Sequence, residues 1–165
     1  GHNFGGRKFP RPHKKARREL APTDCKFVGI IHIKKKRGRG RNRREKGRSA
    51  LAHAELEAIG EACRTLGGWR LWQCTLYVTL EPCCMCAGAI TGAQIPRVVY
   101  GAKDPKMGAG GSLVNLLCLP GCFRPAVTTG VLEEECQALL QTFFRSLRER
   151  KKLLRESTRG EEFEL

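Results

Sequence analysis

Two short segments of the chain carry residues that could hold a metal ion and move protons. The first, HAE, begins at His53, and the second, PCCMC, begins at Pro82. An imidazole and two thiolates are ligands that zinc prefers, and three protein ligands leave a fourth tetrahedral position for water. Such a site is catalytic rather than structural. Glu55, which would not bind the metal, is the candidate for moving protons beside it.

Cys83 and Cys86 are the two thiols that we expect to bind the metal together. Residues three positions apart share one face of a helix. Pro82 favours a helix start directly before them, because its missing N–H would have no partner there. Cys84 is the competing ligand, but it lies two positions from Cys86, so the two sulfurs would point apart. Thiolates at a helix N-terminus are also stabilised by the helix dipole.

His53 and Glu55 also lie two positions apart, and in a regular helix about 200° would separate their side chains. We therefore expect them at the entry of a helix, where the first residue is not yet helical and both can face one cavity. HAE alone is also typical of a solvated helix face, and a lone Cys-x-x-Cys pair of a redox or structural zinc site. In this order, however, the two segments form the pattern of the zinc deaminases.

Strands alternate with helices along the chain, which predicts an α/β fold with a layered sheet. We expect strands over 27–33, 74–80, 97–101 and 126–128, and a turn with a short edge strand within 34–41. We expect helices over 52–66, 83–91 and from 131 to about 154, and a Gly-rich loop over 102–112. The apolar stripe of the last helix is assigned to core packing; it contains Val131, Leu132, Cys136, Leu139, Leu140, Phe143, Phe144 and Leu147.

The positive charge of the chain is confined to its first part. The formal net charge of the 165 residues is +15, and residues 1–50 account for all of it. A block of this kind either binds phosphate backbones through counterion release or is a disordered tail. The length suits one domain. We expect a basic segment over 1–26, for which disorder is one interpretation, a zinc-dependent deaminase domain over 27–156, and an acidic tail over 157–165.

The composition also indicates where the protein works. No stretch approaches 18 apolar residues, so we expect no membrane span. The basic N-terminal part lacks the apolar region of a secretion signal. Without an export signal, the nine cysteines are expected to be metal ligands and core residues in a reducing compartment. The sequence therefore predicts a cytoplasmic protein.

Residues 40–148 resemble bacterial-type tRNA-specific adenosine deaminases, which have the cytidine deaminase-like fold. The resemblance lies in GRGRNR (38–43), HAEL (53–56), TLYVTLEPCCMCAGAI (75–90), RVVYGAKDPKMGAGGSLVNLL (97–117) and GVLEEEC…LL..FFR (130–145). It implies a three-layer α/β/α fold with a mixed central sheet, and a hydrolase that converts adenosine to inosine at the wobble position of tRNA. It also implies one zinc ion per chain, the tRNA anticodon arm as partner, and a homodimer.

The resemblance assigns the chemistry to four residues. His53, Cys83 and Cys86 would bind the zinc ion, and Glu55 would be the proton shuttle. A zinc-bound hydroxide would attack C6 of adenine, because zinc lowers the pKa of its bound water toward about 7. Glu55 would accept the proton of that water and deliver protons to the ring and to the departing amine.

Asn42 and Asp104 are the substrate contacts that the resemblance implies. Asn42 matches a family residue that hydrogen-bonds the flipped base, and Asp104 matches one that approaches the RNA near the target nucleotide. Both residue types are also typical of turns, which is the alternative interpretation at each position.

The chain departs from the family pattern in two places. Residues 1–26 lack the long amphipathic helix with which the family begins, and Cys122-Phe123 replaces the usual Asn-His. Two alternatives to tRNA editing stay open. One is a deaminase of a free base or nucleoside, of the guanine or cytosine type. The other is a catalytically impaired, zinc-stabilised RNA-binding protein.

Overall fold

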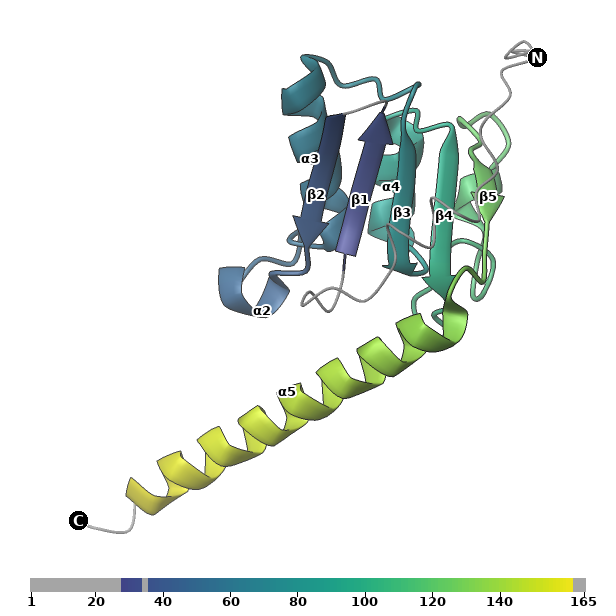
Figure 1. The fold of residues 1–165 in the computed structure, drawn as a ribbon. Coiled ribbons are helices and arrows are strands. Elements are labelled where there is room, and N and C mark those ends of the chain that lie inside the picture. Colours follow the sequence, from purple (N-terminus) through teal and green to yellow (C-terminus); the bar gives the residue numbers. More distant parts are fainter. Residues whose placement is uncertain (1–27, 34–35, 162–165) are drawn as a thin grey trace.

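A mixed five-stranded sheet forms the centre of the fold in the computed structural model, which describes residues 28–33 and 36–161 (Figure 1). In spatial order β2-β1-β3-β4-β5, β1 runs antiparallel to β2 and β3, whereas β3, β4 and β5 run parallel. The predicted α/β class with a mixed sheet is confirmed. Residues 1–26 lie outside the described residues. The strands are β1 (Val28–Ile33), β2 (Lys36–Arg41), β3 (Thr75–Leu80), β4 (Arg97–Ala102) and β5 (Ala126–Thr128).

The predicted helices are present, with shifted ends. α3 and α5 each begin two residues later than expected and α4 begins one residue later, while α5 continues well past 154. The short α2 has no counterpart in the sequence expectations, because its four residues are too few to show a helical period. Within the described residues the helices are α2 (Arg44–Gly47), α3 (Ala54–Leu66), α4 (Cys84–Gly92), the 3-10 helix η1 (Leu116–Cys118) and α5 (Glu133–Glu161).

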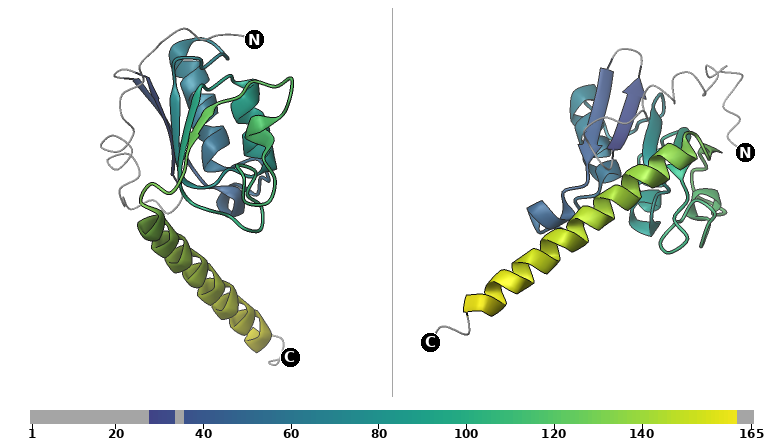
Figure 2. Two further views of the ribbon diagram at one scale, coloured as in Figure 1. Left: turned by 90° about the vertical axis from the view of Figure 1, so that its right-hand side faces the viewer. Right: turned by 60° about the horizontal axis from the view of Figure 1, so that its bottom comes forward.

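The main core lies between the sheet and the helices α3 and α4, which cover the same face (Figure 2). Two glycines allow α3 to lie directly on β1 and β2. A Cβ atom on Gly29 would lie 2.6 Å from the carbonyl oxygen of Ala54, and one on Gly40 would collide with the same oxygen. Because of this close approach, the start of α3 lies in contact with the end of β2. The core side chains include Ile31, Ala58, Ala62, Leu76, Val78, Ala87, Ile90, Val98 and Tyr100.

The opposite face of the sheet packs against the start of α5. Tyr77 and Val99 cluster with Val131, while Ala102 at the end of β4 clusters with Cys136 of α5. A Cβ atom at position 101 would collide with the sulfur of Cys136, so glycine is needed there. Helices therefore lie on both faces, as a three-layer α/β/α arrangement requires.

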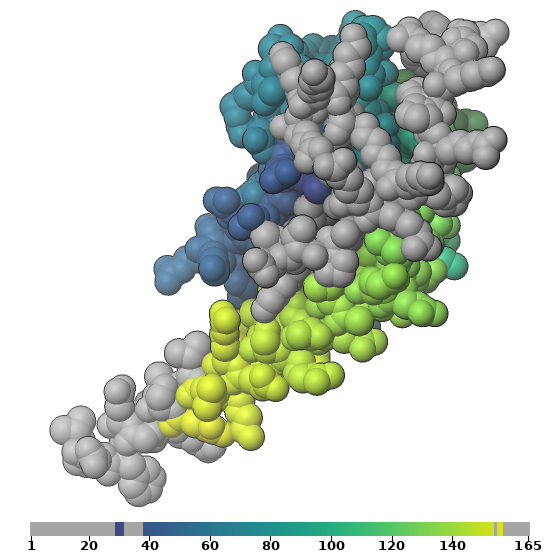
Figure 3. Space-filling view, in the orientation of Figure 1, coloured from purple at the N-terminus to yellow at the C-terminus, as the bar shows by residue number. Residues whose placement is uncertain are grey.

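The apolar stripe of α5 does not all belong to the core, which corrects the sequence expectation. Cys136 and Leu140 are buried, whereas Phe144 is 45% exposed. Beyond this point α5 leaves the sheet and projects as an arm from the body of the protein (Figures 1 and 3). Its residues Phe143, Phe144 and Leu147 line a cavity instead. None of the helices in the described ranges is long and apolar enough to cross a lipid bilayer.

Candidate functional site

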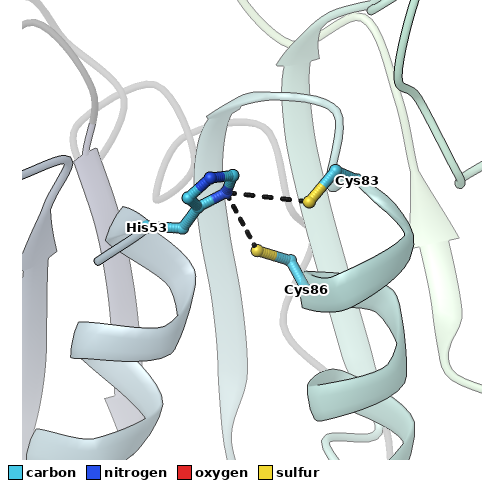
Figure 4. A group of neighbouring side chains, drawn as sticks. All are labelled: His53, Cys83 and Cys86. Carbon is cyan, nitrogen blue, oxygen red and sulfur yellow. Dashed lines mark hydrogen bonds between the residues drawn. The ribbon is translucent and has the colours of Figure 1, made fainter. Parts of the chain in front are cut away.

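The two segments expected to bind a metal meet where α3 and α4 begin (Figure 4). His53 directly precedes α3, and its backbone is extended, with φ −82° and ψ 149°. Cys83 holds the same place before α4 and is also extended, so the helix starts one residue later than predicted. Cys86 lies in the first turn of α4. The Nδ1 atom of His53 lies 3.6 Å from Sγ of Cys83 and 3.5 Å from Sγ of Cys86.

These three side chains form a group that can hold one metal ion. Their ligand atoms lie within 4.8 Å of one another. No other group of three or more His, Cys, Asp or Glu residues meets this condition in the part of the chain that the structure describes. Cys84, the competing thiol, is exposed and lies outside the group.

The residue before each helix supplies the first hydrogen-bond acceptor of that helix. The carbonyl of His53 accepts the N–H of Glu57 at 3.1 Å, and that of Cys83 accepts the N–H of Ala87 at 2.8 Å. The positive ends of two helix dipoles thus point toward the same place. That arrangement favours negatively charged ligands such as thiolates.

The two thiols differ in acidity. The pKa of Cys83 is lowered to about 5, chiefly because the Cys86 thiol donates a hydrogen bond to its sulfur. The same hydrogen bond, together with burial, raises the pKa of Cys86. The pair therefore readily carries one negative charge, which suits the binding of a cation.

Glu55 lies in the first turn of α3, and its side chain is partly buried beside the metal-ligand group. Burial raises the pKa of Glu55, whereas a hydrogen bond to its own backbone, the nearby His53 and a hydrogen bond with Cys86 lower it in part. A glutamate whose pKa is raised in this way holds a proton more readily than an exposed one, as a general acid–base group must.

A cavity of about 260 Å³ lies beside these residues, and its wall is formed by residues from separate parts of the chain. His53 and Glu55 line it from the start of α3, and Cys83 lines it from the start of α4. Asn42, after β2, and Asp104, after β4, also belong to its wall. The structure therefore brings every singled-out residue to one cavity, with the second thiol buried next to it.

Asn42 and Asp104 also hold local turns, so the alternative interpretation of each is observed as well. Oδ1 of Asn42 accepts the N–H of Arg44 at 3.1 Å, at the start of α2. Oδ1 of Asp104 accepts the N–H groups of Lys106 at 2.9 Å and Met107 at 3.1 Å. These bonds use one side-chain atom of each residue. They also fix the orientation of both side chains at the cavity.

Sequence reasoning missed two parts of the cavity wall. The first is Phe143, Phe144 and Leu147 of α5, which were assigned to the core. Nothing in the local pattern marked them, because they continue the same apolar stripe as the core residues of α5. The second is Glu81, which is 2% exposed. Its signal was an acidic residue within the apolar run TLYVTLEPC, where buried charges are rare.

The environment of Glu81 keeps it charged. Burial acts to raise the pKa of Glu81, but hydrogen bonds from Ser112, Asp104 and Gly110 outweigh burial and hold the pKa below its ordinary value. The carboxylate therefore serves as an acceptor for the loop that follows β4.

Charged residues also line the cavity. Arg44 and Glu45 of α2 line it, and Nζ of Lys151 on α5 lies 3.8 Å from a carboxylate oxygen of Glu45. Beyond the apolar wall, α5 carries a group of basic side chains. A negatively charged polymer that approached the cavity would meet this basic group. The group consists of Arg148, Lys151, Lys152 and Arg155.

Comparisons with known proteins agree with this geometry. The MafB19-like deaminase family matches residues 11–148. A tRNA-specific adenosine deaminase of Bacillus subtilis is 52% identical over 120 residues, which cover 72% of this chain and 74% of that protein.

Solved structures show the same fold. One from a study of A-to-I editing by tRNA:A34 deaminases, at the wobble position of transfer RNA, superposes with a TM-score of 0.65. It is 41% identical and covers 69% of this chain and 84% of its own. A guanine deaminase from Nitrosomonas europaea superposes with a TM-score of 0.60 at 26% identity, over 79% of each chain.

Proposed function

The chain belongs to the family of tRNA-specific adenosine deaminases, and we propose that it converts adenosine to inosine at the wobble position of a tRNA. The reaction replaces the 6-amino group of adenine with an oxygen from water and releases ammonia. The observation that carries the proposal is the meeting of His53, Cys83 and Cys86 beside the carboxyl group of Glu55, at one cavity.

Zinc is the proposed metal, with His53, Cys83 and Cys86 as its ligands. In tetrahedral zinc sites the metal lies about 2.3 Å from sulfur and about 2.0 Å from nitrogen, which places ligand sulfur and nitrogen about 3.5 Å apart. The separations of 3.6 and 3.5 Å between Nδ1 of His53 and the two sulfurs fit that value. A zinc ion held there would acidify a water molecule and so supply a nucleophile at neutral pH.

Glu55 is the proposed proton shuttle. Its carboxylate takes one proton from the attacking water and delivers it to N1 of adenine. It then takes the second proton and delivers it to the departing amino group, so that ammonia leaves and the carboxylate is restored. Partial burial beside the metal ligands supports this role, because it favours a glutamate that can hold a proton between the two transfers.

Asn42 and Asp104 are the proposed substrate contacts. A wobble base must be turned out of the anticodon loop before it can reach a carboxyl group inside a cavity. Asn42 would hydrogen-bond the edge of the flipped base from the β2 side. Asp104 would contact the RNA near the target nucleotide from the loop after β4. Their places in the cavity wall support both roles.

The tRNA anticodon arm is the proposed partner, and the basic residues of α5 would contact its phosphates. We also propose a homodimer, because Leu113, Val114 and Leu119 expose apolar surface close together in sequence.

The proposed deaminase domain covers 27–156, between a basic segment (1–26) and an acidic tail (157–165). The cytoplasm is the proposed location, because a tRNA substrate and free thiols both suit it.

A second candidate is a guanine deaminase, which the similarity to the enzyme of Nitrosomonas europaea favours. The same metal ligands and proton shuttle could serve a free purine. The lower identity, 26% against 41% for the structure from the A-to-I editing study, makes it the weaker candidate.

The purified full chain is to be incubated with an anticodon stem-loop RNA that carries a wobble adenosine, and inosine measured by mass spectrometry after digestion to nucleosides. Glu55→Ala is run beside it, and zinc is measured in both proteins. Free guanine and free adenosine are tested in parallel. We expect inosine from the unaltered chain alone, zinc in both proteins, and no conversion of the free substrates.

Other outcomes separate the candidates. Ammonia released from guanine, with no inosine in RNA, would favour the guanine deaminase. Tight RNA binding with bound zinc and no product would favour an impaired RNA-binding protein. Inosine formation by the Glu55→Ala variant would show that Glu55 is not the proton shuttle.

A further inference from the structure

Glu81 directly follows β3, two residues before the metal-ligand residue Cys83, and its side chain is almost completely buried. Its Oε1 atom accepts the N–H groups of Gly110 at 2.9 Å and Ser112 at 3.0 Å. Its Oε2 atom accepts the N–H of Asp104 at 3.1 Å and a further hydrogen bond from the Ser112 hydroxyl. All four donors come from one segment, 104–112, which we call the 104–112 loop.

The 104–112 loop is wrapped closely around this carboxylate. A Cβ atom on Gly108 would lie 2.6 Å from the carboxyl carbon of Glu81. The loop is also tied to the metal-ligand segment, because the N–H of Ala109 donates to the carbonyl of Pro82 at 2.8 Å and Gly108 forms a β-bridge with Cys83. Carboxylate, loop and first thiol therefore form one connected unit.

The same loop forms part of the cavity wall, through Asp104 and Met107. Glu81 binds the loop near both of its ends, at Asp104 and at Ser112. Since the two ends converge on one buried carboxylate, the place of the wall between them depends on that carboxylate. A shorter or differently charged side chain would leave several buried N–H groups without an acceptor, and the loop would rearrange.

We infer that Glu81 is a positioning residue for the RNA substrate. It holds the part of the cavity wall formed by Asp104 and Met107 in the position where this wall can contact the flipped nucleotide beside Glu55. The inference rests on the proposed function and deepens it. Glu81 need not touch the reacting atoms, because it acts through the 104–112 loop. Its effect is therefore on how the substrate is held, rather than on the proton transfers.

Glu81→Gln is the sharpest test, because glutamine keeps the shape of the side chain but replaces one acceptor oxygen with an N–H₂ donor. That donor would face the loop N–H groups. We expect the KM for the stem-loop RNA to rise about tenfold or more, with a smaller change in kcat and with unchanged zinc content. Hydrogen exchange, measured by mass spectrometry, should be faster over 104–112 in the variant than in the unaltered protein, and should be unchanged over α3.

A matched control and a second variant sharpen the test. Glu61→Gln is the matched control, because the Glu61 carboxylate also accepts a backbone N–H, that of Arg39 at 2.6 Å. Glu61 lies on the surface of α3, away from the cavity. We expect it to leave KM and loop exchange unchanged. Ser112→Ala removes one donor and keeps the carboxylate, so its smaller rise in KM should not add to that of Glu81→Gln in the double variant.

The inference is overturned if Glu81→Gln keeps the KM and the loop exchange of the unaltered protein. It is also overturned if zinc, stability and kcat fall together at constant KM, since that pattern indicates a general structural role. Should Glu81→Gln fail to fold, Ser112→Ala decides by the same two measurements. If the unaltered chain forms no inosine, the proposed function fails. The anchoring by Glu81 is tested separately: it is refuted if hydrogen exchange over 104–112 is unchanged in both Glu81→Gln and Ser112→Ala.

Discussion

Sγ of Cys86, in the first turn of α4, lies 3.5 Å from Nδ1 of His53, which directly precedes α3. The two residues are 33 positions apart. They meet because α3 and α4 cover the same face of the sheet and begin at the same end of it (Figure 4). The consequence is a metal-ligand group built at two helix N-termini, where the dipoles favour thiolate ligands.

Cys86→Ala should lose the metal, because it removes a buried ligand of that group. With two of the three protein ligands left, zinc would bind only weakly. The stability that zinc binding gives to the folded chain would then be lost, so the melting temperature should fall by several degrees. Cys84→Ala is the matched control, since its exposed thiol lies outside the group. Metal analysis and thermal unfolding of both variants check this. Full zinc content in Cys86→Ala would contradict the ligand assignment.

Gly40→Ala should destabilise the fold by about 2 to 3 kcal/mol, because the added methyl group would collide with the carbonyl oxygen of Ala54. Gly88→Ala in α4 is the control, since a Cβ atom there meets nothing within 4 Å. It should stabilise the protein by up to about 1 kcal/mol, because alanine is the better helix former. Urea unfolding measures both changes, and equal effects of the two substitutions would refute the close contact of α3 with β2.

The buried thiols should react slowly. Burial raises the pKa of both Cys74 and Cys136 to about 11, so at pH 8 only about one thiol in a thousand is the reactive thiolate. The exposed Cys84, Cys118 and Cys122 should be alkylated before either of them. Peptide mass spectrometry after timed iodoacetamide treatment of the native protein gives the order of labelling. Early labelling of Cys136 would contradict its buried place in α5, against the end of β4.

The same raised pKa values predict a loss of stability at alkaline pH. Unfolding returns Cys74 and Cys136 to their ordinary pKa near 9, so between pH 9 and about 11 the unfolded chain releases protons that the folded chain keeps. The free energy of unfolding therefore falls as pH rises through this range. Denaturant unfolding at pH 8, 9.5 and 10.5 checks this, and Cys136→Ala should weaken the dependence on pH.

The basic residues of α5 should contribute to RNA binding mainly through charge. Arg148→Ala and Lys152→Ala should each weaken binding of the stem-loop RNA and reduce the slope of log K against log salt concentration by about one. Arg64→Ala removes the same charge from the last turn of α3, at the opposite end of that helix from His53, and should leave the slope unchanged. Fluorescence anisotropy at several salt concentrations measures the slopes.

The sequence by itself determined the parts of this site that depend on local geometry. The spacing of Cys83 and Cys86, and the helix entry at His53, follow from the three-residue and two-residue offsets of a helix and its N-terminus. The strands and helices followed from apolar patterns within single segments. For the same reason the expected helix starts were off by one or two residues, because caps are set by the backbone of the neighbouring residue.

Tertiary structure alone decided which distant side chains share the cavity. The pattern of α5 did not separate Cys136, which packs against β4, from Phe143, which lines the cavity, because both belong to one apolar stripe. The role of Glu81 was likewise invisible, since its donors arrive from a loop 23 to 31 positions away. Such contacts depend on strand order and on how closely the layers approach, and these are properties of the packed chain rather than of any one segment.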